Sequence, residues 1–233
     1  MPRFGAPQSL AQFKSDKRFK VEIGGTEGKT IVAINNRKKP FDDVRVRRAI
    51  AAAIDRKQVI DGAMEGYGEP IGSHMVPSDA GYIDLTKVNP YDPDKARALL
   101  KEAGVATPLN VTLTLPPPQY ARKGGEIVAA QLARVGIVAK IENVEWPQWL
   151  AGTFKGNFDL SIISHVEPLD FDRYADPKYY WGYDSQAYRD LLAKYNEATE
   201  AKTREKLLGD IQRHLAENAV NAYLFQLPQF AVS

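Results

Sequence analysis

One loop of the sequence holds acidic side chains close enough together to do chemistry. Glu167, Asp170 and Asp172 follow an apolar run that predicts a strand at 158–164. Two carboxylates at a suitable separation can hydrolyse a glycosidic bond as an acid and base pair. A carboxylate is equally a natural partner for the ammonium group of a bound ligand. We expect ligand binding, and a hydrolase that uses Glu167 and Asp170 is the alternative interpretation.

The same loop is rich in aromatic residues. It reads HVEPLDFDRYADPKYYWGYDS and contains Tyr174, Tyr180 and Trp181 among its rings. Aromatic side chains combine a large apolar surface with defined stacking geometry, so they commonly line ligand sites. The alternative interpretation is that the rings cover the edge of the domain's own core. We predict that some of them contact a ligand.

Two histidines lie in or beside long loops. His74 belongs to a Gly- and Pro-rich stretch at 65–91, and His165 begins the acidic loop. If the loops meet in space, the two rings could bind a metal ion or a carboxylate. We favour two unrelated loop histidines, and we predict no metal, no cofactor and no catalytic residue. The chain has no cysteine, which excludes disulfides, thiol nucleophiles and zinc–thiolate sites.

The strands and helices that must position these loops alternate along the chain. Apolar patterns predict strands at 19–23, 30–35, 109–115, 137–144, 158–164 and 219–227, with a tight connection at 24–29 between the first two. Spacings of three and four predict helices around 46–54, 59–64, 96–103, 127–135, 188–195 and 207–215. Such alternation is typical of an α/β fold, in which ligands bind in loops beyond the carboxyl ends of strands.

The composition is that of an ordinary globular chain. Its 233 residues are 44% hydrophobic and 26% charged, and a formal net charge of +2 is too small to indicate nucleic acid as a partner. The stretch GGTEGKT at 24–30 lacks the spacing of a phosphate-binding loop and precedes a β-prone run. No apolar stretch is long enough to span a bilayer, and the first residues carry no secretory signal. We therefore expect a cytosolic protein, or one whose signal lies outside this chain.

One long motif resembles a known family. The stretch NNRKKPFDDVRVRRAIAAAIDRKQVI at 35–60 is similar to the signature of the extracytoplasmic solute-binding proteins of ABC transporters, family 5, which include dipeptide, oligopeptide and nickel binders. The similarity continues through GYGEP at 66–70, YDPDKA at 91–96, LLKEAG at 99–104 and Trp146. Order and spacing agree over nearly the whole chain. The resemblance covers about half of a family member and corresponds to its larger C-terminal lobe.

The resemblance implies an α/β lobe of the type II periplasmic-binding-protein kind, with a mixed β-sheet flanked by helices on both faces. It divides the chain into a lead-in near the hinge at 1–20, one solute-binding lobe at 21–227, and a truncated return segment at 228–233. The implied function is the solute-binding component of an ABC importer. It would capture peptides or related small organic solutes in a two-lobe cleft and deliver them to a membrane permease.

The implied partners and location follow from that role. The partners are a peptide or small-molecule ligand, the missing N-terminal lobe and the permease, and the location is periplasmic or extracytoplasmic. An isolated lobe exposes its cleft wall and hinge face, so we also predict self-association. A receptor or chaperone with the same fold but no transport role is a further alternative.

The two long loops are predicted to form the wall of the cleft. Many family members carry a Trp-x-x-Asp type of motif after the strand at 158–164, whereas this chain reads SHVEPLD at 164–170. His165 replaces the aromatic residue, so Glu167 or Asp170 would supply the acid. The predicted ligand-binding residues are Ser73, His74, Met75, Ser164, His165, Glu167, Asp170, Tyr174, Tyr180 and Trp181.

Overall fold

The computed structural model describes residues 3–4 and 7–233. Within that part of the chain, seven strands form one sheet in the order β1-β7-β2-β6-β4-β5, with β3 also paired to β7. The strands are β1 (Arg3–Phe4), β2 (Val21–Ile34), β3 (Glu69–Pro70), β4 (Leu109–Leu115), β5 (Ile137–Asn143), β6 (Leu160–His165) and β7 (Ala222–Val232). β4 runs parallel to β5 and β6, whereas β2 runs antiparallel to β6 and β7. The sheet is therefore mixed.

Helices lie between the strands. The α-helices are α1 (Ala11–Lys14), α2 (Val44–Ala53), α3 (Arg56–Met64), α4 (Pro93–Glu102), α5 (Gln119–Ala133), α6 (Trp146–Ala151), α7 (Gln186–Glu197) and α8 (Ala201–Glu217). Short 3-10 turns are η1 (Pro7–Leu10), η2 (Thr153–Lys155) and η3 (Asp170–Ala175). No helix among the described residues combines the length and the apolar character needed to cross a bilayer.

Local signals explain where several helices begin. Asp43, Asp55 and Asp92 are N-caps of α2, α3 and α4, and the side chain of each accepts a hydrogen bond from a backbone N–H of the first turn. Pro93 follows its cap at the first helical position, where a missing N–H costs nothing. The predicted interruption of the first long helical stretch near Asp55 is confirmed.

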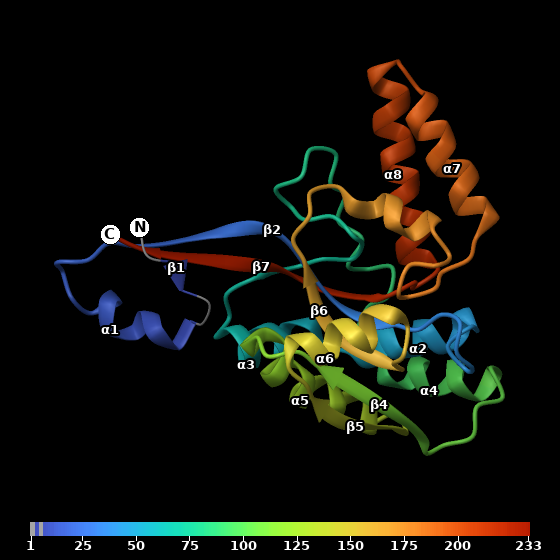
Figure 1. Ribbon diagram of the computed structural model, residues 1–233, viewed down its shortest axis with the longest axis horizontal. Coiled ribbons are helices and arrows are strands. Elements are labelled where there is room, and N and C mark those ends of the chain that lie inside the picture. The colour runs from blue at the N-terminus through green and yellow to red at the C-terminus, as the bar shows by residue number, and fades with distance from the viewer. Residues whose placement is uncertain (1–2, 5–6) are drawn as a thin grey trace.

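One expectation about the strands is wrong. The two predicted strands at 19–23 and 30–35 are a single strand, β2, which passes through Gly24 and Gly25 without turning back. The pairing register with β7 shifts between Gly25 and Lys29, so a β-bulge follows the two glycines. β2 and β7 extend together away from the body of the molecule (Figure 1). β7 also continues beyond the predicted end at 227, because β2 offers it a partner as far as Val232.

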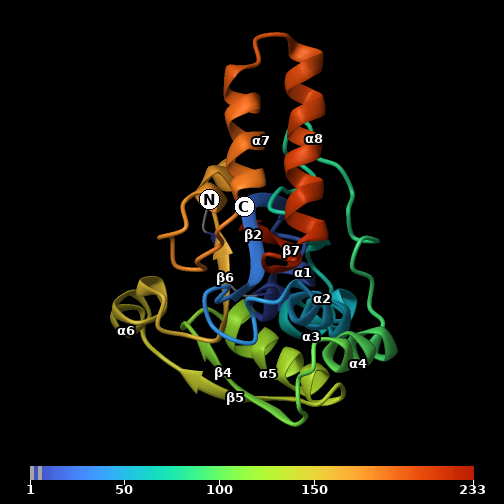
Figure 2. The ribbon, with the colours of Figure 1, turned by 90° about the vertical axis from the view of Figure 1, so that its right-hand side faces the viewer.

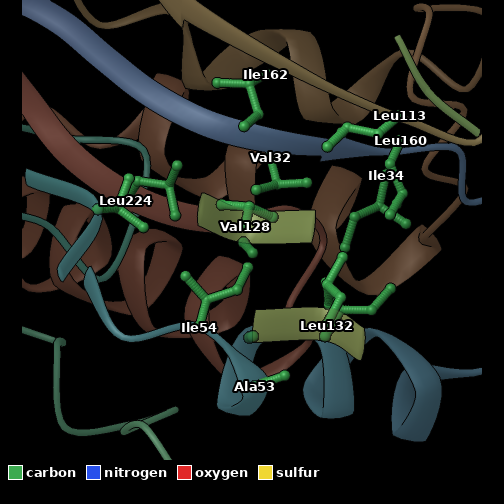
Figure 3. Packing of buried hydrophobic residues seen from close by; sticks show 14 of the residues in the cluster. Val32, Ile34, Ala53, Ile54, Leu113, Val128, Leu132, Leu160, Ile162 and Leu224 are labelled. Carbon is green, nitrogen blue, oxygen red and sulfur yellow. The ribbon is translucent and has the colours of Figure 1, made fainter. Parts of the chain in front are cut away.

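Alternate residues of the central strands face two different cores. Val32 and Ile34 of β2, with Leu160 and Ile162 of β6, pack against α2, α3, α4 and α5 on one face. Figure 3 shows Val128 and Leu132 of α5 beside these strand residues. Ile31, Ala33 and Ile163 point to the other face, as the period of two requires, and join an aromatic cluster with α6, η3, α7 and α8. Helices therefore cover both faces of the sheet.

The helices α7 and α8 form an antiparallel hairpin that stands away from the sheet (Figures 1 and 2). Tyr188 of α7 and Ile211 and Leu215 of α8 are buried at its base. The hairpin thus closes one side of the aromatic cluster.

Candidate functional site

The acidic loop and the Gly- and Pro-rich loop meet on the aromatic face of the sheet, beyond the carboxyl end of β6. The rings of His74 and His165 lie edge to face with their centroids 5.3 Å apart. Both rings also contact Trp181. The interpretation of two unrelated loop histidines is therefore wrong, because tertiary packing joins residues that are far apart in sequence.

Asp170 is the centre of a buried polar network. Its Oδ1 lies 2.8 Å from Nζ of Lys29 and 3.0 Å from Nε2 of His74, and its Oδ2 lies 3.1 Å from Nδ1 of His165. Lys29 is 1% exposed and Asp170 is 6% exposed. An ionised pair at this depth requires good geometry and further hydrogen bonds to offset its lost hydration. Nδ1 of His165 makes one such hydrogen bond, and Nε2 of His74 lies in contact with the other carboxylate oxygen.

Tyrosines hold the outer nitrogens of both imidazoles. The hydroxyl of Tyr174 lies 2.9 Å from Nδ1 of His74, and the hydroxyl of Tyr180 lies 2.8 Å from Nε2 of His165. Asn221 donates a hydrogen bond of 2.9 Å to the Tyr174 hydroxyl. We assign the tautomers from these partners: each tyrosine donates to its histidine, and each histidine directs its own N–H at Asp170.

The electrostatics of the site agree with that assignment. Complete burial lowers the pKa of His74 to about 4, which the Asp170 carboxylate only partly offsets, so the ring is neutral at pH 7. Burial alone raises the pKa of the Asp170 carboxyl, but the His74 and His165 rings outweigh it and hold that pKa well below its usual range. Asp170 is therefore ionised at neutral pH.

The donor set His74, His165 and Asp170 has the composition of a metal site. One ligand atom from each lies within 4.8 Å of the others. The residues do not fit a metal ion as they stand, however, because the ammonium of Lys29 already neutralises the carboxylate. A metal would also have to displace the protons that both rings direct at Asp170.

A short exposed segment covers this network. Val166, Glu167 and Leu169 are exposed, and the side chain of Glu167 is 67% accessible. The backbone carbonyl of Glu167 accepts a hydrogen bond from Nζ of Lys29 beneath it. Leu169 adopts a φ of 49°, in the left-handed region that branched residues rarely enter. The segment thus presents one carboxylate between apolar side chains at the surface.

A second pair of carboxylates lies on the neighbouring loop and strand. A hydrogen bond to Asp79 raises the pKa of the Glu27 carboxyl. Gln226 of β7 ties the two segments together, since its amide donates to the Thr26 carbonyl at 2.8 Å and to the Ser78 hydroxyl at 2.9 Å. The loop at 72–79 is therefore tied to β7 and to β2, the strand that carries Lys29.

The predicted ligand-binding residues divide into two groups. Glu167 is exposed and Ser164 is half-buried. The other eight are buried: Ser73, His74, Met75, His165, Asp170, Tyr174, Tyr180 and Trp181. Those eight form the layer beneath the surface, and their contact with a ligand stays a prediction.

Sequence reasoning missed Lys29, Asn221 and the Glu27–Asp79 pair. The sequence did contain a pattern that points to Lys29. The residue shares its strand face with Ile31 and Ala33, so the alternation places a charged side chain among buried positions. The pattern GGTEGKT drew attention to phosphate binding instead, and that reading was rejected correctly, because the following residues are strand. Asn221 and Asp79 gave no comparable signal.

Comparison with known proteins places the chain among binding proteins. Residues 3–199 match the family described as bacterial extracellular solute-binding proteins, family 5 Middle. The chain is 33% identical over 162 residues to di/tripeptide-binding protein 1 of Pseudomonas aeruginosa, covering 67% of this chain and 30% of that protein. It is 35% identical over 150 residues to the dipeptide-binding protein of Escherichia coli, covering 62% and 28% of the two chains.

Solved structures agree on the fold. The periplasmic binding protein DppA of Helicobacter pylori, in complex with the peptide STSA, superposes with a TM-score of 0.86 at 25% sequence identity. The match covers 97% of this chain and 47% of that one. The fold is thus a lobe of the type II periplasmic-binding-protein kind. The chain spans about half the length of the solved structures that it matches. Its matched segments cover 30% and 28% of the two curated relatives.

Proposed function

The chain belongs to the bacterial extracellular solute-binding proteins of family 5, and from that premise we propose that it forms one wall of a cleft that binds peptides or related small organic solutes. The match of 97% of the chain to DppA in its peptide complex carries the proposal. The whole protein would close a second lobe over the solute and deliver it to an ABC permease. Closure of that kind excludes water from the bound solute.

The wall would be the surface formed by the loop at 72–79 and the segment at 164–170. Its buried layer is the polar network centred on Asp170. Its outer layer offers the carboxylate of Glu167 between exposed Val166 and Leu169. A carboxylate next to apolar side chains suits the amino group and a side chain of a peptide-like solute.

The alternative of a hydrolase is not favoured. An acid catalyst needs a carboxyl group that still holds its proton near neutral pH. The pKa of Asp170 lies well below its usual range instead, and the ammonium of Lys29 pairs with it. Asp170 therefore lacks the proton of an acid catalyst, and its burial and its pairing with Lys29 deny it the access to substrate or water that a base requires.

The remaining proposals concern context. We propose an extracytoplasmic location, and partners comprising the second lobe and the permease. The division into a lead-in at 1–20, a lobe at 21–227 and a return segment at 228–233 stays a proposal.

The lobe alone would self-associate through its exposed wall, and sedimentation that shows only monomer at high concentration would contradict this.

Native mass spectrometry of the protein purified gently from its host tests the proposed function. A co-purified peptide ladder or small molecule would support solute binding and identify its class. Empty spectra, repeated after incubation with a dipeptide and tripeptide library, would contradict peptide binding. Turnover of a panel of glycosides or peptides would instead support an enzyme.

A further inference from the structure

Lys29 occupies an unusual position for a lysine. It lies on β2 directly opposite His165 of β6, and its side chain points to the aromatic face of the sheet. The residue is 1% exposed, although lysine is almost never buried without a partner. Its Nζ contacts two oxygen acceptors, Oδ1 of Asp170 and the backbone carbonyl of Glu167. The lysine therefore links Glu167, within the exposed segment, to Asp170, which directly follows that segment.

The surroundings of Nζ are those of a site for an ammonium ion. One acceptor is an ionised carboxylate and the other is a carbonyl oxygen. The carboxylate is hydrogen-bonded to His165 through Oδ2 and contacts His74 through Oδ1. Both rings are held in turn by tyrosine hydroxyls. Such outer hydrogen bonds fix the acceptor in place before any cation arrives.

We propose that Lys29 is a specificity-determining residue whose ammonium fills a site that would otherwise bind the amino group of a solute. With Lys29 present, Asp170 is neutralised from within and takes no part in solute recognition. A solute amine at this wall pairs with the exposed Glu167 instead. The consequence for solutes rests on the proposed function, whereas the filled ammonium site is a property of this chain alone.

Chemical rescue of Lys29→Ala tests the proposal without knowledge of the natural solute. The substitution removes three methylene groups and the ammonium, which n-propylammonium matches atom for atom. We expect n-propylammonium to bind this variant in calorimetry with a Kd on the order of millimolar, given so few atoms. At about 100 times Kd it should raise the Tm by roughly 5–10 °C.

Three controls make the rescue specific. n-Propanol has nearly the same shape without the charge, and it should not raise the Tm. n-Propylammonium should not raise the Tm of the unsubstituted protein, because its own lysine occupies the site. The double variant Lys29→Ala with Asp170→Asn retains the cavity and loses the anion, so its rescue should disappear. A folded Lys29→Ala that shows no rescue, or equal rescue by n-propanol, would overturn the proposal.

A second comparison decides the matter if Lys29→Ala does not fold. Lys29→Met fills the volume and leaves Asp170 as a buried anion without its cation. Adding Asp170→Asn to Lys29→Met should then raise the Tm, and no rise would overturn the proposal. None of these measurements depends on transport, so empty spectra in the solute search would contradict the proposed function and leave this result standing.

Discussion

His74 should make the stability of the protein depend on pH in a specific direction. Its pKa is about 4 in the folded protein, against an ordinary value of 6.5. Between these values the unfolded chain binds a proton that the folded protein does not. Acid therefore favours the unfolded chain: the stability is complete above pH 6.5 and is lost as the pH falls towards 4.

The magnitude follows from the difference of 2.5 between 6.5 and about 4. Each pKa unit corresponds to about 1.4 kcal/mol. Protonation of His74 should therefore lower the free energy of unfolding by about 3 kcal/mol as the pH falls from above 6.5 to about 4. This is a large part of the roughly 5–15 kcal/mol that stabilises a typical domain. The cause is burial, since the ring is enclosed by Tyr174, Trp181 and Asp170 and has no access to water.

Urea unfolding followed by circular dichroism between pH 7.5 and 4.5 measures this effect. His74→Gln should unfold at a lower urea concentration. Its free energy of unfolding should also depend less steeply on pH, because unfolding then takes up about one proton fewer. His214→Gln is the matched control, because that ring is only half-buried beside Tyr183 and its pKa is also lowered by burial. Equal slopes for His74→Gln and the unsubstituted protein would refute the reasoning. Greater stability at pH 5 than at pH 7 would show instead that His74 is an imidazolium paired with Asp170.

Three further substitutions test other parts of the site. Asp170→Asn should cost about 3–5 kcal/mol in urea unfolding, because it leaves the Lys29 ammonium buried without its anion; a loss below about 1 kcal/mol would contradict a buried pair. Gly72→Ala should cost at least about 1–3 kcal/mol, since its Cβ would lie 2.1 Å from the carbonyl carbon of Leu85, whereas Gly24→Ala meets nothing within 4 Å and should be nearly neutral. Glu167→Gln should leave the Tm unchanged and weaken a cationic dipeptide by about 1–3 kcal/mol in calorimetry; unchanged affinity would remove Glu167 from the wall.

The starts of α2, α3 and α4 were predictable because their signals are local, whereas α5 begins at Gln119, well before the predicted start at 127. Asp43, Asp55 and Asp92 cap helices through bonds to residues two or three positions away, and the patterns of three and four mark the faces that are buried. The strand Leu109–Leu115 was equally clear from its alternation. The turn expected at Gly24-Gly25 is wrong because a glycine pair permits a turn without requiring one. Pairing with β7 keeps the chain extended through both glycines.

The candidate site shows the same division more sharply. The sequence by itself determined the family, the α/β order of elements and the two long loops that carry the candidate residues. Only the tertiary structure decided that Asp170 is an internal partner of Lys29, and that eight of the ten predicted residues lie beneath the surface. Burial and ion pairing depend on residues far apart in the chain, such as Lys29 and Asp170, and no local pattern of residue types reports which of them meet.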